Sequence, residues 1–210
     1  METQNERANY YAALKDFQHA RRRAQFEQVV ARLTGKSADL FSYDDVRQKL
    51  RVKRRPSTRE LKEIPLNAIV GSVGRYNDFP RRFLPKRSAD QGRWAKVRTV
   101  ATGAQGWPPI EVYQVGDTYF VIDGHHRVSV ARQFDSSHIE AYVTQVSTKV
   151  PLSPEDQPED LILKAEYTAF LEHTHLDESC PDVDLTLTAL GQYQVLEEHI
   201  AVHRYFMGIE

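Results

Sequence analysis

The amino-acid sequence predicts an α/β protein, in which a small mixed-sheet unit is flanked by helical extensions at both ends. Short apolar alternations between residues 61 and 148 follow the order strand, helix, hairpin, helix, strand, which is typical of a mixed sheet. On both sides of that unit, apolar residues recur at helical spacing instead. The chain has 210 residues, 40% of them hydrophobic, which is enough for a sizeable core and excludes disorder as the main state.

The formal charge changes along the chain and divides it into three parts. We expect residues 1–60 to form a basic helical region, residues 61–148 the α/β unit, and residues 149–210 an acidic helical extension. Residues 1–62 carry a net charge of +7 and residues 151–210 a net charge of −11, so the total of −1 is a cancellation. Such asymmetry predicts an anionic partner for the basic part, or an electrostatic contact between the parts.

Two helices are predicted in the N-terminal part. Residues 6–33 carry apolar side chains at helical spacing, with Gly35 as the stop, and the basic run 21–23 projects from the middle. A second helix begins near Ser42, whose side chain can cap it, and ends before Pro56. The basic clusters are either a solvated surface or an anion-binding surface, and two helices alone do not make a DNA-reading module.

The central part predicts the sheet and its two helices. Gly116 allows a tight hairpin between two of the strands, because glycine accepts a positive φ. The first helix is expected to pack into the core through Trp94 and to end at Gly103. At the end of the second helix, Phe134 is available for packing. In order, we expect a strand at 64–70, a helix near 89–102, strands at 110–115 and 118–122, a helix at 125–134 and a strand at 139–146.

The C-terminal part predicts two helices, at 159–173 and 192–206, with a short apolar alternation at 183–187 between them. The single cysteine, Cys180, excludes an intrachain disulfide. No apolar stretch approaches the roughly 20 residues of a membrane span. The polar N-terminus lacks the apolar core of a signal peptide, so we expect a cytoplasmic protein with no membrane contact.

The most informative segment is the junction where the strand at 118–122 runs directly into the helix that follows it. The first N–H groups of that helix lack internal partners and point beyond the end of the strand. Gly124 lets an anion approach the backbone, Arg127 adds a fork suited to phosphate oxygens, and His125 and His126 add donors. This composition predicts a phosphate-binding junction.

Other interpretations of the same residues stay open at this point. Asp123 can be a simple helix cap, and Arg127 can pair with a neighbouring carboxylate. Adjacent histidines point in different directions on a helix, so one of them can be structural. A metal site is weaker, because only one carboxylate and two imidazoles are local.

On these residues the stretch from Ile64 to Val146 resembles the ParB/sulfiredoxin superfamily. The opening Ile64-Pro65-Leu66, the strand Tyr119–Ile122, the Gly-x-x-Arg at Gly124–Arg127 and the closing Ile139–Val143 fall in the family's order. In the chromosome-partitioning branch the junction typically reads Gly-Glu-Arg-Arg and binds nucleotide phosphates. In the sulfiredoxin branch it reads Gly-Cys-His-Arg, with a nucleophilic cysteine.

The departures from both branches narrow what the resemblance implies. His125 stands where sulfiredoxin has its cysteine, and Cys180 lies outside the unit, so sulfinic acid reduction is not expected. The sequence after the unit, where the chromosome-partitioning branch has its DNA-reading part, also shows no clear helix-turn-helix pattern. Asp-Gly-His-His-Arg looks most like a further branch that includes small-molecule kinases, in which this loop holds the phosphates of an adenine nucleotide. That resemblance implies ATP or CTP as the ligand, and phosphoryl transfer with Mg²⁺ as the chemistry.

Four further residues are candidates for that chemistry. Asp78 and Asp123 are the nearest carboxylates for a catalytic base or for Mg²⁺. Arg75 and Arg82 follow the first strand, in a region that borders the ligand site in this superfamily, and can clamp phosphates. The alternative for either arginine is a solvated loop.

Three functional hypotheses follow from the sequence. The first is nucleotide binding at Gly124–Arg127, with phosphoryl transfer or hydrolysis. The alternative is a ParB-like DNA-binding protein that uses the basic N-terminal helices, with an affinity that falls steeply with salt. The third is an adaptor whose acidic extension covers its own basic front.

Overall fold

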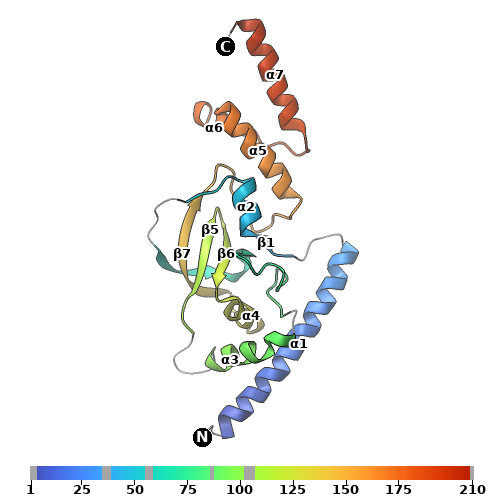
Figure 1. Ribbon diagram of the computed structural model, residues 1–210, viewed down its shortest axis with the longest axis vertical. Helices are drawn as coiled ribbons and strands as arrows, with labels where there is room; N and C mark the ends of the chain where they lie inside the picture. Colours follow the sequence, from blue (N-terminus) through green and yellow to red (C-terminus); the bar gives the residue numbers. More distant parts are fainter. Residues whose placement is uncertain (1–3, 35–38, 55–58, 86–87, 102–106, 209–210) are drawn as a thin grey trace.

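A seven-stranded mixed sheet lies at the centre of the molecule, with helices on both of its faces and a helical extension beyond one end (Figure 1). The computed structural model describes residues 4–34, 39–54, 59–85, 88–101 and 107–208. The predicted α/β class, a mixed sheet with flanking helices, is confirmed. Among the described helices, none has both the length and the apolar character that a membrane span requires.

The sheet has the strand order β1-β4-β6-β5-β7-β2, and β3 pairs with β7 beside β2. The β1–β4, β4–β6 and β5–β7 pairs are parallel, whereas β5–β6, β3–β7 and β2–β7 are antiparallel. Because β1 and β2 come from residues 39–54, the sheet crosses the boundary predicted at residue 60. The strands are β1 (Phe41–Ser42), β2 (Lys53–Arg54), β3 (Glu60–Pro65), β4 (Ile69–Ser72), β5 (Ile110–Val115), β6 (Thr118–Asp123) and β7 (His138–Ser147).

The hairpin between β5 and β6 forms where the sequence predicts it. Gly116 has a φ of 58°, and a Cβ at this position would lie 2.9 Å from the carbonyl oxygen of Leu152. The turn therefore needs glycine for its backbone conformation and for the close approach of the chain that follows β7.

Helices cover both faces of the sheet because neighbouring strand residues point to opposite sides. In β6, Val121 faces the cluster beneath α4 (His125–Gln133), and Phe120 faces the cluster beneath α2 (Tyr43–Lys49). Ser42 caps α2 by accepting a hydrogen bond from the Asp45 backbone, as predicted.

Two further helices form an outer layer over α4, as Figure 1 shows. They are α1 (Gln4–Thr34) and α3 (Gln91–Ala101). Phe17 of α1 meets Trp94 of α3 edge to face, with ring centroids 5.7 Å apart. Trp94 is fully buried, as predicted, and its indole N–H donates to Ser129 of α4 at 3.0 Å.

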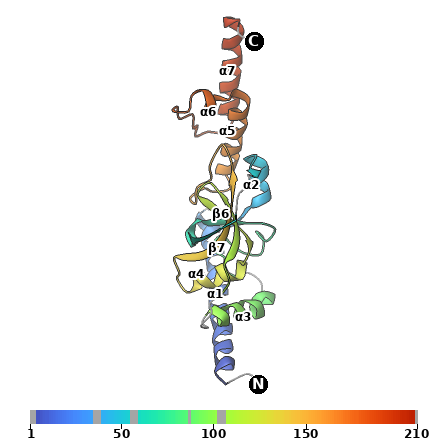
Figure 2. The same ribbon diagram turned by 90° about the vertical axis from the view of Figure 1, so that its left-hand side faces the viewer.

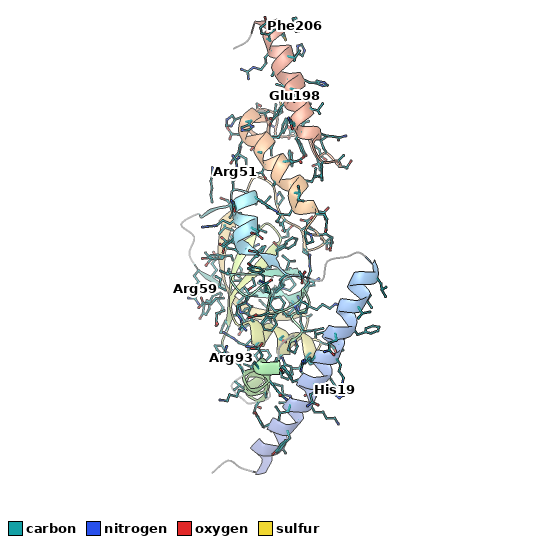
Figure 3. The ribbon with its side chains drawn as sticks, turned by 45° about the vertical axis from the view of Figure 1, so that its right-hand side comes forward. His19, Arg51, Arg59, Arg93, Glu198 and Phe206 are labelled. Carbon is teal, nitrogen blue, oxygen red and sulfur yellow. The ribbon has the colours of Figure 1, made fainter. Side chains whose placement is uncertain are left out.

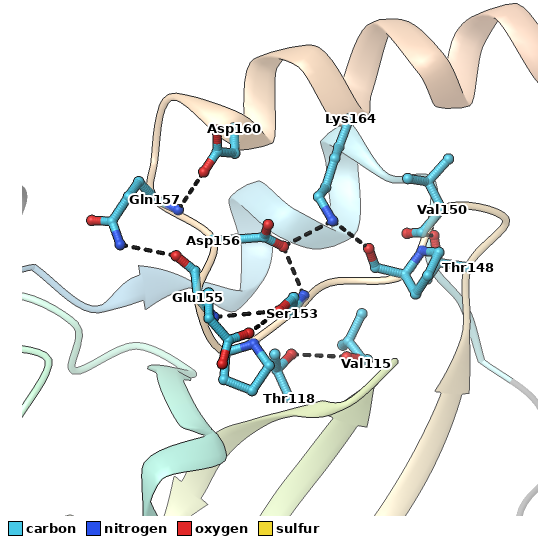
Figure 4. Close-up of polar contacts among 12 residues, drawn as sticks. Val115, Thr118, Thr148, Val150, Ser153, Glu155, Asp156, Gln157, Asp160 and Lys164 are labelled. Atoms are coloured by element: carbon cyan, nitrogen blue, oxygen red, sulfur yellow. Dashed lines mark hydrogen bonds and ion pairs between the residues drawn. The ribbon is translucent and has the colours of Figure 1, made fainter. Parts of the chain in front are cut away.

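The C-terminal extension carries its own small core and reaches one end of the long axis (Figure 2). It consists of α5 (Asp160–Thr174), α6 (Leu176–Ser179) and α7 (Gln192–Met207), with Phe170 and Tyr193 buried between them. The linker before α5 is held by polar contacts (Figure 4). Lys164 donates to the Pro151 carbonyl at 2.7 Å and pairs with Asp156 at 2.9 Å.

Two predicted elements end differently from the prediction. The strand predicted at 64–70 is divided into β3 and β4 by a 3₁₀ turn, Leu66–Ala68, which begins where Pro65 has no N–H for the ladder. The second helix ends at Lys49 instead of running on toward Pro56. Arg51 takes a left-handed φ of 47°, which turns the chain into β2.

Some apolar residues lie on other surfaces than the sequence suggests. Phe134, which was expected to pack, is 45% exposed, because it follows the last residue of α4. The alternation at 183–187 forms no strand, and its leucines cover the extension's core. The stops expected at Gly35, Pro56 and Gly103 lie outside the described residues.

Candidate anion-binding site

The strand–helix junction is shaped by one glycine between β6 and α4. Gly124 is the N-cap of α4 and has a φ of 103°. A Cβ at this position would lie 2.4 Å from Cγ2 of Ile110. The N–H of Val128 is the first in α4 to bond within the helix, to the Gly124 carbonyl, so the three N–H groups before it have no intrahelical acceptor. The junction therefore places the first backbone donors of α4 at the end of β6, closely packed against Ile110 and Arg127.

His126, in the first turn of α4, is buried without any hydrogen-bond partner. The residue is 6% exposed, and both of its ring nitrogens are buried and unpaired. Its Nε2 faces Oδ1 of Asp90 at 3.8 Å, while Oδ2 of Asp90 is also buried and unpaired. Unsatisfied polar groups of this kind cost stability, and their accumulation at one place is a mark of a ligand site.

His125 makes a firm contact inside the core. Its Nε2 lies 2.6 Å from the hydroxyl oxygen of Ser72 at the end of β4. The Phe79 ring stacks on His125 at a centroid distance of 5.9 Å and meets His126 edge to face at 5.5 Å. His125 therefore positions the helix on the sheet, and His126 is the histidine of the pair that remains available.

Arg75 bridges the two carboxylates beside the histidines. Its Nε donates to Asp78 at 2.9 Å, and its Nη2 lies 3.7 Å from Asp90. The guanidinium also stands 5.3 Å from the Phe79 ring centroid. One cation thus lies between two carboxylates at the mouth of the junction, held by contacts that a ligand anion can replace.

Both histidines are neutral at pH 7. Burial lowers the pKa of His125 to about 4, with further lowering by Arg75 and His126. Burial likewise lowers the pKa of His126 to about 4, although the nearby Asp90 carboxylate acts in the opposite direction. Each imidazole therefore offers one N–H donor and one acceptor rather than a positive charge.

Arg127 is engaged in a structural contact. Its Nη1 donates to the carbonyls of Pro108 and Pro109 at 2.6 and 2.8 Å, and its Nη2 pairs with the Asp123 carboxylate. The guanidinium thereby fixes the chain that leads into β5. The Asp123 side chain is 69% exposed at the end of β6.

Of the predicted site residues, the structure thus brings four together beside Gly124: Arg75, Asp78, His125 and His126. Asp123 and Arg127 pair with each other instead. Arg82 lies elsewhere, in a groove of about 350 Å³ at the C-terminal end of α4, together with Arg23 and Arg132. Among the described residues, no cluster of three or more histidine, cysteine, aspartate or glutamate side chains is suited to a metal ion.

Sequence reasoning missed three residues of this site, which are Ser72, Phe79 and Asp90. Ser72 could have been found, because it directly follows Gly71 at the end of a buried strand. Asp90 gives no comparable signal in the sequence, because it precedes α3 and only the tertiary structure brings it close to His126.

Comparisons with known proteins add little. No protein-family model matches the sequence, and no curated protein matches it significantly. Among solved structures, sulfiredoxin from Arabidopsis thaliana is similar to 42% of this chain over 88% of its own length, with 20% identity and a TM-score of 0.33. A likeness at that level assigns neither a family nor a function to this chain.

Proposed function

We propose that the protein binds the phosphates of a nucleotide at the N-terminus of α4, with His126 and Arg75 as the side-chain donors. The observation that carries this proposal is the His126 ring, whose two nitrogens are buried and unpaired beside the first N–H groups of α4, which have no acceptor within the helix. A bound phosphate oxygen would accept a hydrogen bond from the ring and relieve the cost of the unpaired donor.

Charge and backbone geometry support a phosphate in particular. A helix N-terminus favours anions, and the first N–H groups of α4 have no acceptor within the helix. Arg75 supplies a positive charge in the same cluster once a phosphate displaces Asp78 and Asp90 from it. The resemblance of Asp-Gly-His-His-Arg to the ParB/sulfiredoxin superfamily supports a nucleotide, ATP or CTP, as the carrier of these phosphates.

Phosphoryl transfer or hydrolysis is the chemistry that we propose for this site. An acceptor hydroxyl or a water attacks the γ phosphorus, the bond to the β–γ bridging oxygen breaks, and the nucleoside diphosphate leaves with that electron pair. Asp78 can take the acceptor proton once phosphate replaces it on Arg75. Mg²⁺ would be held mostly by the phosphates, with Asp78 or Asp123 as a protein ligand, and would neutralise their charge.

Calorimetric titration with ATP, CTP and GTP in the presence of Mg²⁺ tests the proposal. The decisive variant is His126→Phe, because the ring is buried against Phe79 and phenylalanine keeps the packing while it removes both nitrogens. We expect unchanged or higher thermal stability and at least about tenfold weaker binding. His173→Phe, at an exposed position on α5, is the matched control.

Two results would refute nucleotide binding at this junction. One is that no nucleotide binds to the wild type. The other is that binding persists unchanged in both His126→Phe and Arg75→Gln. Arg127→Ala is a less informative variant, because it also releases the carbonyls of Pro108 and Pro109.

Duplex DNA binding is the second candidate function, and the exposed basic part of α1 favours it. Lys15, His19 and Arg22 lie along one side of the helix and are all exposed. Deleting residues 1–60 is no clean test, because it removes buried Phe17 and the core residues of α2. The surface variant Arg22→Glu should instead weaken binding and reduce its salt dependence, whereas salt-insensitive or absent binding would contradict this function.

A further inference from the structure

The helix α1 has two faces of different character. Its inner face is a stripe of buried residues, Ala13, Phe17, Ala20 and Ala24. The described side chains of this helix past Ala24 are all exposed. The outer face is a second stripe at spacings of four, three, four, three and four residues, all of them exposed: Lys15, His19, Arg22, Phe26, Val29 and Leu33.

That outer stripe changes from basic to apolar along the helix. Phe26 is 69% exposed, Val29 53% and Leu33 82%. Alternating spacings of three and four residues form the seam along which one helix packs on another. A large apolar patch of this kind, bordered by positive charge, marks an interaction surface.

The helix α7 has a complementary outer face. Tyr193, Leu196 and Ile200 face the core of the extension, and every described residue after Ile200 is exposed. The opposite stripe has the spacing three, four, three and consists of Val195, Glu198, Val202 and Tyr205. Val195 is 50%, Val202 55% and Tyr205 81% exposed.

These two stripes do not meet within one chain. In Figures 1 and 2, α7 forms one end of the long axis and α1 begins at the other end. The two helices share no buried cluster among the described residues. Figure 3 shows His19 on α1 far from Glu198 and Phe206 on α7. A contact between the stripes therefore requires two molecules.

We propose that the outer face of α1 docks in parallel on the outer face of α7 of a second copy of this chain. Residues 19, 22, 26 and 29 have the same spacing as residues 195, 198, 202 and 205, so the stripes match position by position. This register places Arg22 opposite Glu198 and Phe26 opposite Val202. An antiparallel pairing of the same stripes would instead place Arg22 opposite Val202 and Phe26 opposite Glu198, which leaves both charges unpaired.

Net charge supports the same choice of partner. The stripe on α1 belongs to the basic end of the chain and the stripe on α7 to the acidic end, so each end attracts the opposite end of another copy. Because the two faces differ, the contact is head to tail, and each copy keeps one free α1 face or α7 face for the next. The interface is small, so we expect weak, concentration-dependent association.

Two surface variants test this arrangement by sedimentation velocity, with circular dichroism to verify folding. Phe26→Asp removes the α1 face, and Val202→Asp removes the α7 face. The mean mass of the wild type should rise with concentration, and each variant alone should stay monomeric. An equimolar mixture of the two variants should form a dimer and nothing larger, because one intact face of each kind remains.

A charge exchange tests the register. Arg22→Glu should abolish association, and adding Glu198→Arg in the same chain should restore it, whereas Arg93→Glu on α3 should have no effect. The proposal is overturned if the wild type stays monomeric at all concentrations. It is equally overturned if that monomer uses Arg22 to bind duplex DNA or anionic vesicles. It is also overturned if either single-face variant still associates, or if the mixture gives no dimer.

Discussion

His126 Nε2 and Asp90 Oδ1 face each other across 3.8 Å, a gap that is too wide for a hydrogen bond. Both groups are buried, and neither the ring nor the second carboxylate oxygen has another partner. The Phe79 ring packs edge to face on His126, and Arg75 lies 3.7 Å from the same Asp90 oxygen. The cluster therefore holds buried polar atoms that a polar ligand group could pair, and the first predictions concern its residues.

If an anion binds as proposed, Asp90 would compete with it for Arg75. Asp90→Asn removes that negative charge, so we expect phosphate or ATP to bind about fivefold more tightly, which corresponds to about 1 kcal/mol. Calorimetric titration measures the change, and Asp135→Asn, at an exposed position near the other end of α4, is the control. Weaker binding in Asp90→Asn would show that the carboxylate supports the ligand instead of competing with it.

The buried histidines make stability depend on pH. Their folded-state pKa values, about 4, lie below the ordinary value of 6.5, so the unfolded chain binds more protons between these values. The free energy of unfolding should therefore be largest above pH 6.5 and fall as the pH drops toward 4. Each histidine contributes a loss on the order of 3 kcal/mol.

Urea denaturation at several pH values between 7.5 and 4.5 measures this loss. His126→Phe should lose clearly less stability than the wild type over the same range, because one of the two histidines no longer titrates. Parallel curves for the two proteins would contradict a buried, neutral His126.

The junction tolerates no side chain at its first position. Gly124→Ala combines a positive φ with a Cβ overlapping Ile110, so we expect a loss of at least about 2 kcal/mol. Gly92→Ala in α3 is the matched control, because no atom lies within 4 Å of its Cβ, and it should be neutral or stabilising by up to about 1 kcal/mol. Thermal or chemical denaturation compares the pair, and equal effects would show that the junction is not constrained.

Arg81 fastens the linker of the C-terminal extension to the loop that carries Arg75. It donates to the carbonyls of Pro154 and Asp156 and stands over the Phe41 ring at 5.1 Å. Arg81→Met should therefore accelerate limited proteolysis of residues 151–159, by about tenfold, while Arg93→Met leaves the rate unchanged. Cleavage elsewhere in the variant would mean that the arginine stabilises the whole fold instead.

The sequence predicts the sheet and its helices well where local pattern and burial agree. The hairpin at Gly116 and the helix beginning at His125 are set by turn chemistry and by a glycine at the junction, and both form as expected. The outer stripe of α1 is different. Phe26 and Leu33 repeat at the same three- and four-residue spacing as the buried residues, but on the opposite face of the helix, and only the tertiary fold determines which of the two faces is covered.

The site shows a similar division between local and tertiary information. Gly124 and His126 were predictable, because both lie in the first turn of one helix. The pairing of Arg127 with a neighbouring carboxylate, Asp123, was among the predicted alternatives and is confirmed. Its other acceptors, the carbonyls of Pro108 and Pro109, were not predictable, because the tertiary fold brings them to it. Asp90 is set apart from the junction by α3 and two strands in sequence, and no local pattern connects it to His126.

Arg132 has a consequence for how a ligand reaches the junction. Its guanidinium donates to the carbonyls of Leu66, Ile69 and Arg81, and it stands over the Phe83 ring at 5.3 Å. Ser72, the last residue of β4, contacts His125, and it lies at the other end of the loop that leads to Arg81. The backbone around the site is thus fastened on both sides, so for the proposed ligand we expect access to depend on rotation of the Arg75 and Asp90 side chains instead. Ligand capture should then be fast and limited by encounter, without the slow phase that the closure of a lid would add.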